Sequence, residues 1–315
     1  MVVNQWVPAA HKGDAIGDSA RRVRGLLRGL GHESEIYALT IDDDLKGEVR
    51  PFSDPASKRG DLTIFHFALV SPLTREFARL PGGRVLQYHN VTPAHYFADY
   101  DANIFRLAML GREDLKSLVG QTDVALGDSE YNRQELDDLG FTNTGVFPIA
   151  IDTARITGAP RRPALENTLQ ADGFLNFLFV GRIVPNKKIE DHIKLAEHYK
   201  RYVDESYRFV FVGKTDAAPR YFSTIQALMA EYRMPPGRFL FTSIHFFWDG
   251  EGCALRDYSD PTRTHPPTPD RSRKTAQIVP LIKNERVFLT NFLANDRVSD
   301  WRAIIEQQNR IWGIG

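Results

Sequence analysis

Apolar runs alternate with amphipathic segments along the first 150 residues. The run at 2–7 has the length of a buried strand. After it, apolar residues spaced by 4, 3, 4 and 3 positions from Ile16 to Leu30 predict one face of a helix, which Gly31 ends. The same criteria predict strands at 34–39, 62–67, 84–88, 123–126 and 145–149 and helices at 72–80, 100–119 and 130–139. Strands that alternate with helices favour a parallel sheet with crossover helices.

A polar, proline-bearing segment at 153–173 interrupts this pattern and is typical of a linker. The alternation then restarts. Strands are predicted at 174–180, 207–212 and 238–242, and helices at 189–202 and 221–232. These segments predict a second βαβαβ unit.

The alternation stops after residue 242. The segment 254–275 is rich in arginine, aspartate, proline, serine and threonine, so we expect it to be disordered. One last helix is predicted at 298–312. We therefore expect the second sheet to have only about three strands. The predicted parts are an N-terminal domain at 1–152, a linker at 153–173, a partial C-terminal domain at 174–242 and an atypical, partly disordered tail at 243–315.

Composition narrows the function classes. Hydrophobic residues make up 42% of the chain and charged residues 25%, as in ordinary globular proteins. The formal net charge is zero, which leaves no overall positive field to hold nucleic acid. The single cysteine, Cys253, excludes a disulfide framework and a cysteine-rich zinc site. No apolar run approaches the roughly 20 residues that span a bilayer, and the start is too short and polar for a signal peptide, so we expect a cytoplasmic protein.

Two clusters of like charge have simple explanations. Arginines at 21, 22, 24 and 28 lie on the first predicted helix. A solvated helix face is the favoured explanation, and peripheral contact with an anionic membrane is the alternative. The acidic run 42–44 falls in a polar loop, where a solvated turn is favoured over a metal site, so no metal is predicted.

The stretch Gly-Arg-Ile-Val-Pro-Asn-Lys-Lys at 181–188 follows a buried strand and opens a helix. Backbone N–H groups at a helix start favour phosphate. Arg182 offers a bidentate fork and Lys187 a point charge, which together could neutralise a diphosphate. A sugar-nucleotide transferase has that electrostatic need. A strand-to-helix turn with solvated charges is the alternative that these residues leave open.

Further candidate residues follow predicted strands at their carboxyl ends, where open α/β sheets bind ligands. His66 ends one strand, and His89 and Asn90 follow the next. A lone histidine is more often structural than functional, so the residues alone leave both explanations open. The other candidates are Gly13, Asp14 and Gly17 in the first glycine-bearing turn, Ser129 at a predicted helix start, and Gly213 in the turn after the strand at 207–212. Their alternatives are a flexible loop and a simple capping serine.

Several of these motifs resemble those of family 4 glycosyltransferases, which have the two-domain GT-B fold. Phe-Val-Gly-Arg at 179–182 with Pro-Asn-Lys at 185–187 resembles the donor-phosphate motif. Tyr-His-Asn-Val-Thr-Pro at 88–93 is similar to a stretch that lies close to the transferred sugar. The segments 13–18, 65–73 and 127–132 extend the match, which covers about residues 2–242. Lys188 stands where the family commonly has glycine, and we expect it to crowd the turn or to add charge.

The resemblance implies an α/β fold made of a GT-B-like pair of Rossmann-like domains, the second incomplete. It implies that Arg182 and Lys187 contact the diphosphate of the donor and that His89 lines the sugar pocket. Gly13 and Gly17 would let the first loop approach donor or acceptor.

The implied reaction moves a hexose from a nucleotide-diphosphate sugar, UDP- or GDP-linked, to a hydroxyl acceptor with retention of configuration. The resemblance implies no obligatory metal. It also implies no cofactor, because the nucleotide-sugar donor is itself a substrate. The implied partners are the nucleotide sugar and a carbohydrate or lipid-linked acceptor, as in polysaccharide biosynthesis.

The family's Glu-x7-Glu stretch has no counterpart after the strand at 238–242, where the resemblance places it. Glu251 is followed by Gly252 and Cys253, but the residue eight positions after it is Ser259. A reading-frame slip or deletion after Thr242, or a naturally shortened chain, would explain the loss. The alternative function is therefore a non-catalytic remnant that acts as a binding module or is inactive. A nicotinamide-dependent oxidoreductase is disfavoured, because no Gly-x-Gly-x-x-Gly fingerprint follows a strand.

Overall fold

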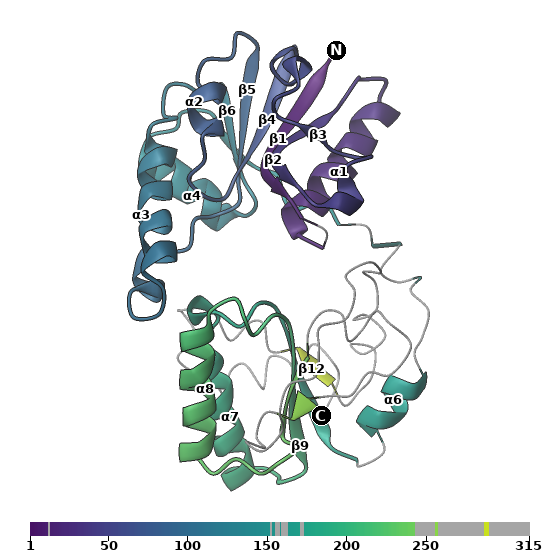
Figure 1. The fold of residues 1–315 in the computed structure, drawn as a ribbon, viewed down its shortest axis with the longest axis vertical. Coiled ribbons are helices and arrows are strands. Elements are labelled where there is room, and N and C mark those ends of the chain that lie inside the picture. The colour runs from purple at the N-terminus through teal and green to yellow at the C-terminus, as the bar shows by residue number, and fades with distance from the viewer. Residues whose placement is uncertain are drawn as a thin grey trace. The chain divides into compact units, whose positions relative to one another are not determined.

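The computed structural model describes residues 1–11, 13–151, 153–154, 158, 163–170, 173–242, 256–257 and 287–289. The chain divides into two compact units, Met1–Asp152 (unit 1) and Thr153–Gly315 (unit 2) (Figure 1). Each unit contains its own sheet, parallel in unit 1 and parallel except for β11 (Arg256–Asp257) in unit 2, which confirms the predicted α/β class.

Unit 1 is built on a seven-stranded parallel sheet in the order β3-β2-β1-β4-β5-β6-β7. Its strands are β1 (Val3–Ala10), β2 (Ile36–Ile41), β3 (Arg50–Pro51), β4 (Leu62–Phe67), β5 (Gly83–Tyr88), β6 (Val124–Gly127) and β7 (Thr144–Val146). Its α-helices are α1 (Ala15–Gly29), α2 (Leu73–Phe77), α3 (Ala102–Lys116) and α4 (Glu130–Leu139). The strand order reverses direction at β1, so right-handed crossovers place α1 on one face and α2, α3 and α4 on the other (Figure 1).

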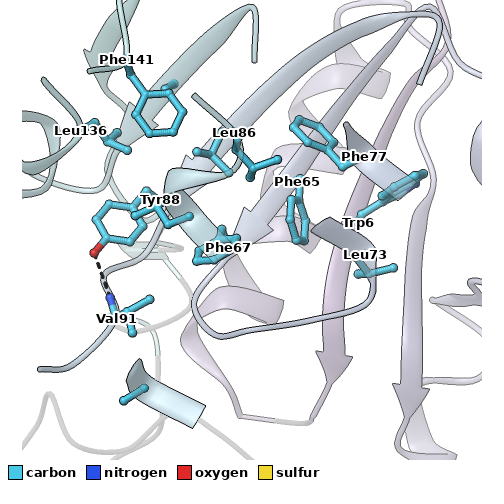
Figure 2. Close-up of a cluster of buried hydrophobic side chains, with 14 of the residues drawn as sticks. Trp6, Phe65, Phe67, Leu73, Phe77, Leu86, Tyr88, Val91, Leu136 and Phe141 are labelled. Atoms are coloured by element: carbon cyan, nitrogen blue, oxygen red, sulfur yellow. Dashed lines mark hydrogen bonds between the residues drawn. The ribbon is translucent and has the colours of Figure 1, made fainter. Parts of the chain in front are cut away.

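An aromatic core fills the face of unit 1 that carries α2 and α4 (Figure 2). Side chains alternate along β4, so Phe65 and Phe67 point into this core while His66 points to the α1 face. Trp6 of β1 is fully buried there, and its indole N–H donates to the carbonyl of Ser57 at 2.9 Å. The opposite face receives Gln5 and His66 of the same strands, and it also carries a smaller apolar cluster that includes Val7.

The described residues of unit 2 form a five-stranded sheet in the order β11-β10-β9-β8-β12. Its strands are β8 (Leu175–Val180), β9 (Tyr207–Val212), β10 (Phe239–Thr242), β11 (Arg256–Asp257) and β12 (Val287–Leu289), and its helices are α6 (Pro163–Gln170), α7 (Ile189–Tyr202) and α8 (Pro219–Glu231). The α7 and α8 helices lie along one face of the sheet (Figure 1). The expected three-stranded sheet is wrong, because β11 pairs antiparallel with β10 and β12 pairs parallel with β8.

Phenylalanine rings cross this second sheet from strand to strand. Phe177 stacks on Phe209 with ring centroids 4.6 Å apart, and Phe211 stacks on Phe241 at 4.7 Å. Cross-strand aromatic pairs of this kind add about 0.2–1 kcal/mol each to sheet stability. These ring contacts link β8 to β9 and β9 to β10, and so support the loops that follow those strands.

A helix occupies part of the predicted linker. Leu169 of α6 is buried, and its carbonyl accepts hydrogen bonds from the side chains of Asn176 at 3.0 Å and Arg208 at 3.1 Å. A cation at a helix C-terminus also complements the helix dipole. The predicted helix at 298–312 and the region of Glu251 lie outside the described residues, as does most of the segment 254–275.

Candidate functional site

The loop between β8 and α7 carries the sequence-predicted phosphate motif. It leaves the carboxyl end of β8 at Gly181 and passes through the 3-10 turn Pro185–Lys187 (η4) before α7 begins. Gly181 N–H donates to the carbonyl of Val212 at 2.9 Å, and Ile183 N–H donates to that of Lys214 at 3.1 Å. These bonds hold the loop against the end of β9.

Gly213 makes this contact possible. A Cβ atom added to Gly213 would lie 1.8 Å from the carbonyl oxygen of Gly181, which is far inside any allowed contact. The structure thus brings Gly213 and the loop that carries Arg182 together at one edge of the sheet. Glycine is needed here for close backbone approach rather than for a positive φ.

Arg182 and Lys187 concentrate positive charge on this loop. The pKa of Lys187 lies below its usual range, first because the ammonium is partly desolvated and second because the charge of Arg182 is near. Among the residues that the structure describes, no carboxylate forms an ion pair with either side chain. An arrangement of two close cations is costly in the absence of an anion and favourable in its presence.

The start of α7 contributes less to this site than the sequence suggests. Lys188 caps the helix in the left-handed conformation, with φ 48° and ψ 53°. The N–H of Ile189 donates to the hydroxyl of Tyr221 at 2.7 Å, and that hydroxyl in turn donates to Glu190. Burial, followed by the charge of Glu190, raises the pKa of Tyr221. Since Ile189 N–H already has a partner, attraction for an anion rests mainly on the two cationic side chains.

Unit 1 contains a second polar cluster at the carboxyl ends of its strands. His66 Nδ1 lies 2.9 Å from His89 Nε2, and the planes of the two rings are nearly parallel, with an angle of 4° between them. His89 Nδ1 lies 2.8 Å from a carboxylate oxygen of Asp128, and His66 Nε2 lies 3.0 Å from the amide oxygen of Gln5. The structure therefore joins the two sequence-predicted histidines in one hydrogen-bonded chain.

Burial makes this cluster electrostatically sensitive. His66 is fully buried, and the side chain of His89 is 2% exposed. Desolvation first, and the neighbouring charge of His89 second, hold the pKa of His66 well below its usual range. His66 is consequently neutral at ordinary pH.

Sequence reasoning missed Gln5, Gln87 and Asp128 as members of this cluster. Gln87 Nε2 donates to Asp128 at 3.3 Å and to the carbonyl of Phe147 at 3.2 Å. A signal was present, because Gln5 and Gln87 are amides in segments predicted as buried strands. Both are fully buried, and the strand pleat places them on the face that His66 occupies.

A neighbouring network fixes the chain just after His89. Asn90 adopts a left-handed backbone conformation with φ 69°. The hydroxyl of Tyr88 donates to Glu135 at 2.8 Å and accepts from the N–H of Val91 at 3.1 Å (Figure 2). Burial, and then the carboxylate of Glu135, raise the pKa of Tyr88. This buried hydroxyl holds the turn that positions Asn90.

The remaining candidates of unit 1 lie at helix starts. Asp14 caps α1 by accepting from the N–H of Gly17 at 3.1 Å, and Gly13 before it has φ +78°. Ser129 caps α4 by accepting from the N–H of Asn132 at 3.3 Å. Local capping thus explains Asp14 and Ser129 by their contacts, and their predicted part in ligand binding stays a prediction.

The described residues contain no group of three or more histidine, cysteine or acidic side chains suited to hold a metal ion. In the same part of the chain, every helix is too short or too polar to cross a bilayer.

The sequence matches no protein-family model and no curated protein significantly. Its structure resembles that of HepE from Anabaena in complex with UDP-glucose, with a TM-score of 0.55 and 11% identity over 77% of this chain and 69% of the other. Sucrose-phosphate synthase from Thermosynechococcus elongatus aligns with a TM-score of 0.54 and 12% identity, over 77% of this chain and 70% of its own. WaaG, a glycosyltransferase involved in lipopolysaccharide biosynthesis, aligns with a TM-score of 0.52 and 11% identity, over 76% and 70%. At such identities the likeness concerns the fold, and the chain has the GT-B fold of glycosyltransferases.

Proposed function

We propose that this chain is a nucleotide-sugar glycosyltransferase that moves a hexose from a UDP- or GDP-linked donor to a hydroxyl acceptor, with retention of configuration. The proposal is carried by the two cations, Arg182 and Lys187, at the carboxyl end of β8. Open α/β sheets bind ligands at this edge. A leaving nucleoside diphosphate develops negative charge that two preorganised cations stabilise.

The electrostatics of unit 2 support this assignment. Partial desolvation first, and the charge of Arg182 second, make protonation of Lys187 less favourable and lower its pKa. A bound diphosphate would reverse the effect of Arg182, because it places negative charge between the two cations. The proposed site therefore gains more from an anion than two isolated surface cations would.

The proteins of similar fold support a nucleotide sugar as the donor. The structure of HepE contains UDP-glucose, and sucrose-phosphate synthase is another protein with this fold. We propose the same donor class here, with a carbohydrate or lipid-linked alcohol as acceptor and with no cofactor besides the donor.

Calorimetric titration with UDP, GDP and their sugars tests the donor site. Arg182→Ala removes one charged contact, which we expect to weaken donor binding by roughly 10- to 100-fold. Arg201→Ala is the matched control, because Arg201 lies in the last turn of α7 and its guanidinium bonds Glu197. Equal binding by wild type and Arg182→Ala would contradict the assignment.

A second function, nucleotide binding without transfer, is favoured by one observation. The sequence after residue 242 lacks the Glu-x7-Glu stretch that family 4 enzymes use against the sugar and the ribose, since Ser259 stands where the second glutamate would follow Glu251. Donor binding without release of nucleoside diphosphate, in the presence of a panel of sugar and lipid-linked acceptors, would support this alternative. Release of UDP or GDP that requires an acceptor would support transfer.

A further inference from the structure

We propose that Asp128, His66 and Gln5 hold His89 as a doubly protonated imidazolium, so that His89 acts as a hydrogen-bond donor and not as a base. Asp128 is then a positioning residue that sets the charge and ring orientation of His89. All the residues involved lie in unit 1, so this protonation state does not depend on sugar transfer. The donors and acceptors along one buried chain of hydrogen bonds determine it.

The chain of hydrogen bonds begins at Gln5, whose side-chain amide has a fixed orientation. Its amide nitrogen donates to the carbonyl of Ala20 in α1 at 3.0 Å. Turning the amide over would place two oxygens against each other in a fully buried position, which is strongly unfavourable. The amide oxygen of Gln5 therefore faces His66 and can only accept.

The orientation of Gln5 selects the tautomer of His66. The Nε2 atom of His66 lies 3.0 Å from the Gln5 oxygen, so Nε2 carries the proton. His66 is neutral because burial holds its pKa well below the usual range. Its Nδ1 atom consequently has a free lone pair and can only accept.

His89 must then donate from both ring nitrogens. Its Nε2 lies 2.9 Å from the accepting Nδ1 of His66, so a proton lies on Nε2. Its Nδ1 lies 2.8 Å from one oxygen of Asp128, whose other oxygen accepts from Gln87 at 3.3 Å. The proton between Nδ1 and the nearer Asp128 oxygen lies on Nδ1 of His89 and not on Asp128, because a carboxyl group is a stronger acid than an imidazolium by about two to three pKa units in water.

The side-chain amide of Gln87 cannot be reversed so that its oxygen faces Asp128. Its amide nitrogen also donates to the carbonyl of Phe147 at 3.2 Å, so the reversed amide would face two acceptors. The group of five side chains therefore favours one arrangement of protons: neutral His66, cationic His89 and anionic Asp128. A protonated Asp128 beside a neutral His89 would make the same hydrogen bonds, but it would place the shared proton on the weaker base. The buried charges of His89 and Asp128 compensate each other, as burial requires.

This arrangement limits the chemistry available to His89. Both ring nitrogens already carry protons, so the ring cannot remove a proton from an acceptor hydroxyl. A ligand that displaces His66 from Nε2 would meet a charged N–H donor, which suits a hydroxyl or phosphate oxygen. A role for His89 next to a sugar is then one of donation and charge.

Nitrogen-15 NMR of the histidine side chains in the full chain tests the proposal directly. We expect one ring at neutral pH to show protons bound to both nitrogens, whereas His66 shows a proton on Nε2 only. The signals are assigned by their loss in His89→Asn and His66→Asn. A His89 ring with one unprotonated nitrogen in the wild type would overturn the proposal, whatever the variants do.

A pair of isosteric substitutions separates charge from packing. Asp128→Asn removes the carboxylate that compensates His89, so we expect that ring to lose one of its two N–H signals. Asp123→Asn is the matched control, since Asp123 lies just before the same strand, β6, and accepts from the N–H of Arg84. Two retained N–H signals in folded Asp128→Asn would overturn the positioning role, and so would a lost signal in Asp123→Asn.

Discussion

Lys188 shows at the scale of one residue why this loop favours glycine. The residue has φ 48° and ψ 53°, a left-handed conformation that costs a non-glycine residue roughly 1–2 kcal/mol. The sequence-based expectation was crowding or added charge, and the structure adds a backbone reason. The carbonyl of Lys188 also accepts from Asp191 N–H at 3.0 Å, so this conformation is part of the helix start.

We expect Lys188→Gly to stabilise unit 2 by about 0.5–1 kcal/mol, because relief of the left-handed strain exceeds the added backbone entropy of glycine in the unfolded chain. Denaturant unfolding measures the change. Arg233→Gly is a matched control, since Arg233 also has φ 48° and follows the end of α8. Both variants should gain stability, and a loss in Lys188→Gly alone would show that its side chain contributes more than its backbone costs.

Lys187 gives the proposed donor site a pH dependence. Its pKa in the folded chain is lowered by desolvation and by Arg182, so the unfolded chain binds this proton more tightly. As pH rises from the lowered pKa toward the ordinary value of about 10.4, this lysine therefore makes unit 2 more stable. Over the same range the ammonium loses its charge, so affinity for UDP should fall.

Calorimetry at about pH 7.5 and about pH 9.5 tests this expectation. Lys187→Arg keeps its charge over that range and should lose less affinity for UDP than the wild type does. Titration of the uracil ring of UDP affects binding to both proteins equally, so it does not contribute to the difference between the wild type and Lys187→Arg. An identical loss in both proteins would contradict a contact between Lys187 and the diphosphate.

At the scale of elements, the loops that leave β8 and β9 are in direct backbone contact. Gly213→Ala would force a Cβ to within 1.8 Å of the Gly181 oxygen, so the two loops must separate. We expect a loss of roughly 2–4 kcal/mol in the unfolding free energy of unit 2, together with weaker binding of UDP. Gly25→Ala is the control, because nothing lies within 4 Å of its added Cβ on α1 and the helix should gain about 0.5–1 kcal/mol.

Sequence pattern located the long elements and missed those defined by distant pairing. The strands β4 and β9 and the helix α7 begin and end at the predicted residues, because their apolar periodicity is strong. The short strands β3 and β11 have two residues each, too few to show an apolar periodicity. The strand β12 pairs with β8, where Val287 lies opposite Asn176, and no local window contains both. The helix α6 is held by Asn176 and Arg208, and these contacts outweigh its polar, proline-bearing sequence.

The candidate sites show the same division. Arg182 and Lys187 are close in sequence, so a motif could identify them together. The cluster around His89 draws one side chain each from β1 and β4, one from β5 and one from the turn after β6, and only the strand order brings them together. The sequence did contain one signal of this cluster, the amides Gln5 and Gln87 within predicted strands, but it was not recognised as such.

At the scale of the whole molecule, two sheets with separate cores should respond separately to a ligand. UDP at about 100 times its dissociation constant stabilises the unit that binds it by roughly 2.7 kcal/mol. We expect hydrogen exchange of amides in β9 to slow in UDP while exchange in β4 stays unchanged, and Arg182→Ala to abolish the slowing. Equal slowing in both strands would show that the two units are coupled or share the ligand.

The edge strand β12 has a consequence for synthesis of the chain. Val287 pairs with Asn176 of β8, so one edge of the unit 2 sheet remains open until β12 has left the ribosome. Nascent unit 2 thus presents unpaired peptide groups of β8 throughout that interval, whereas every strand of unit 1 has already emerged. Chaperones that recognise open strands should therefore bind the growing chain at β8, and a chain cut before residue 287 should stay bound to them.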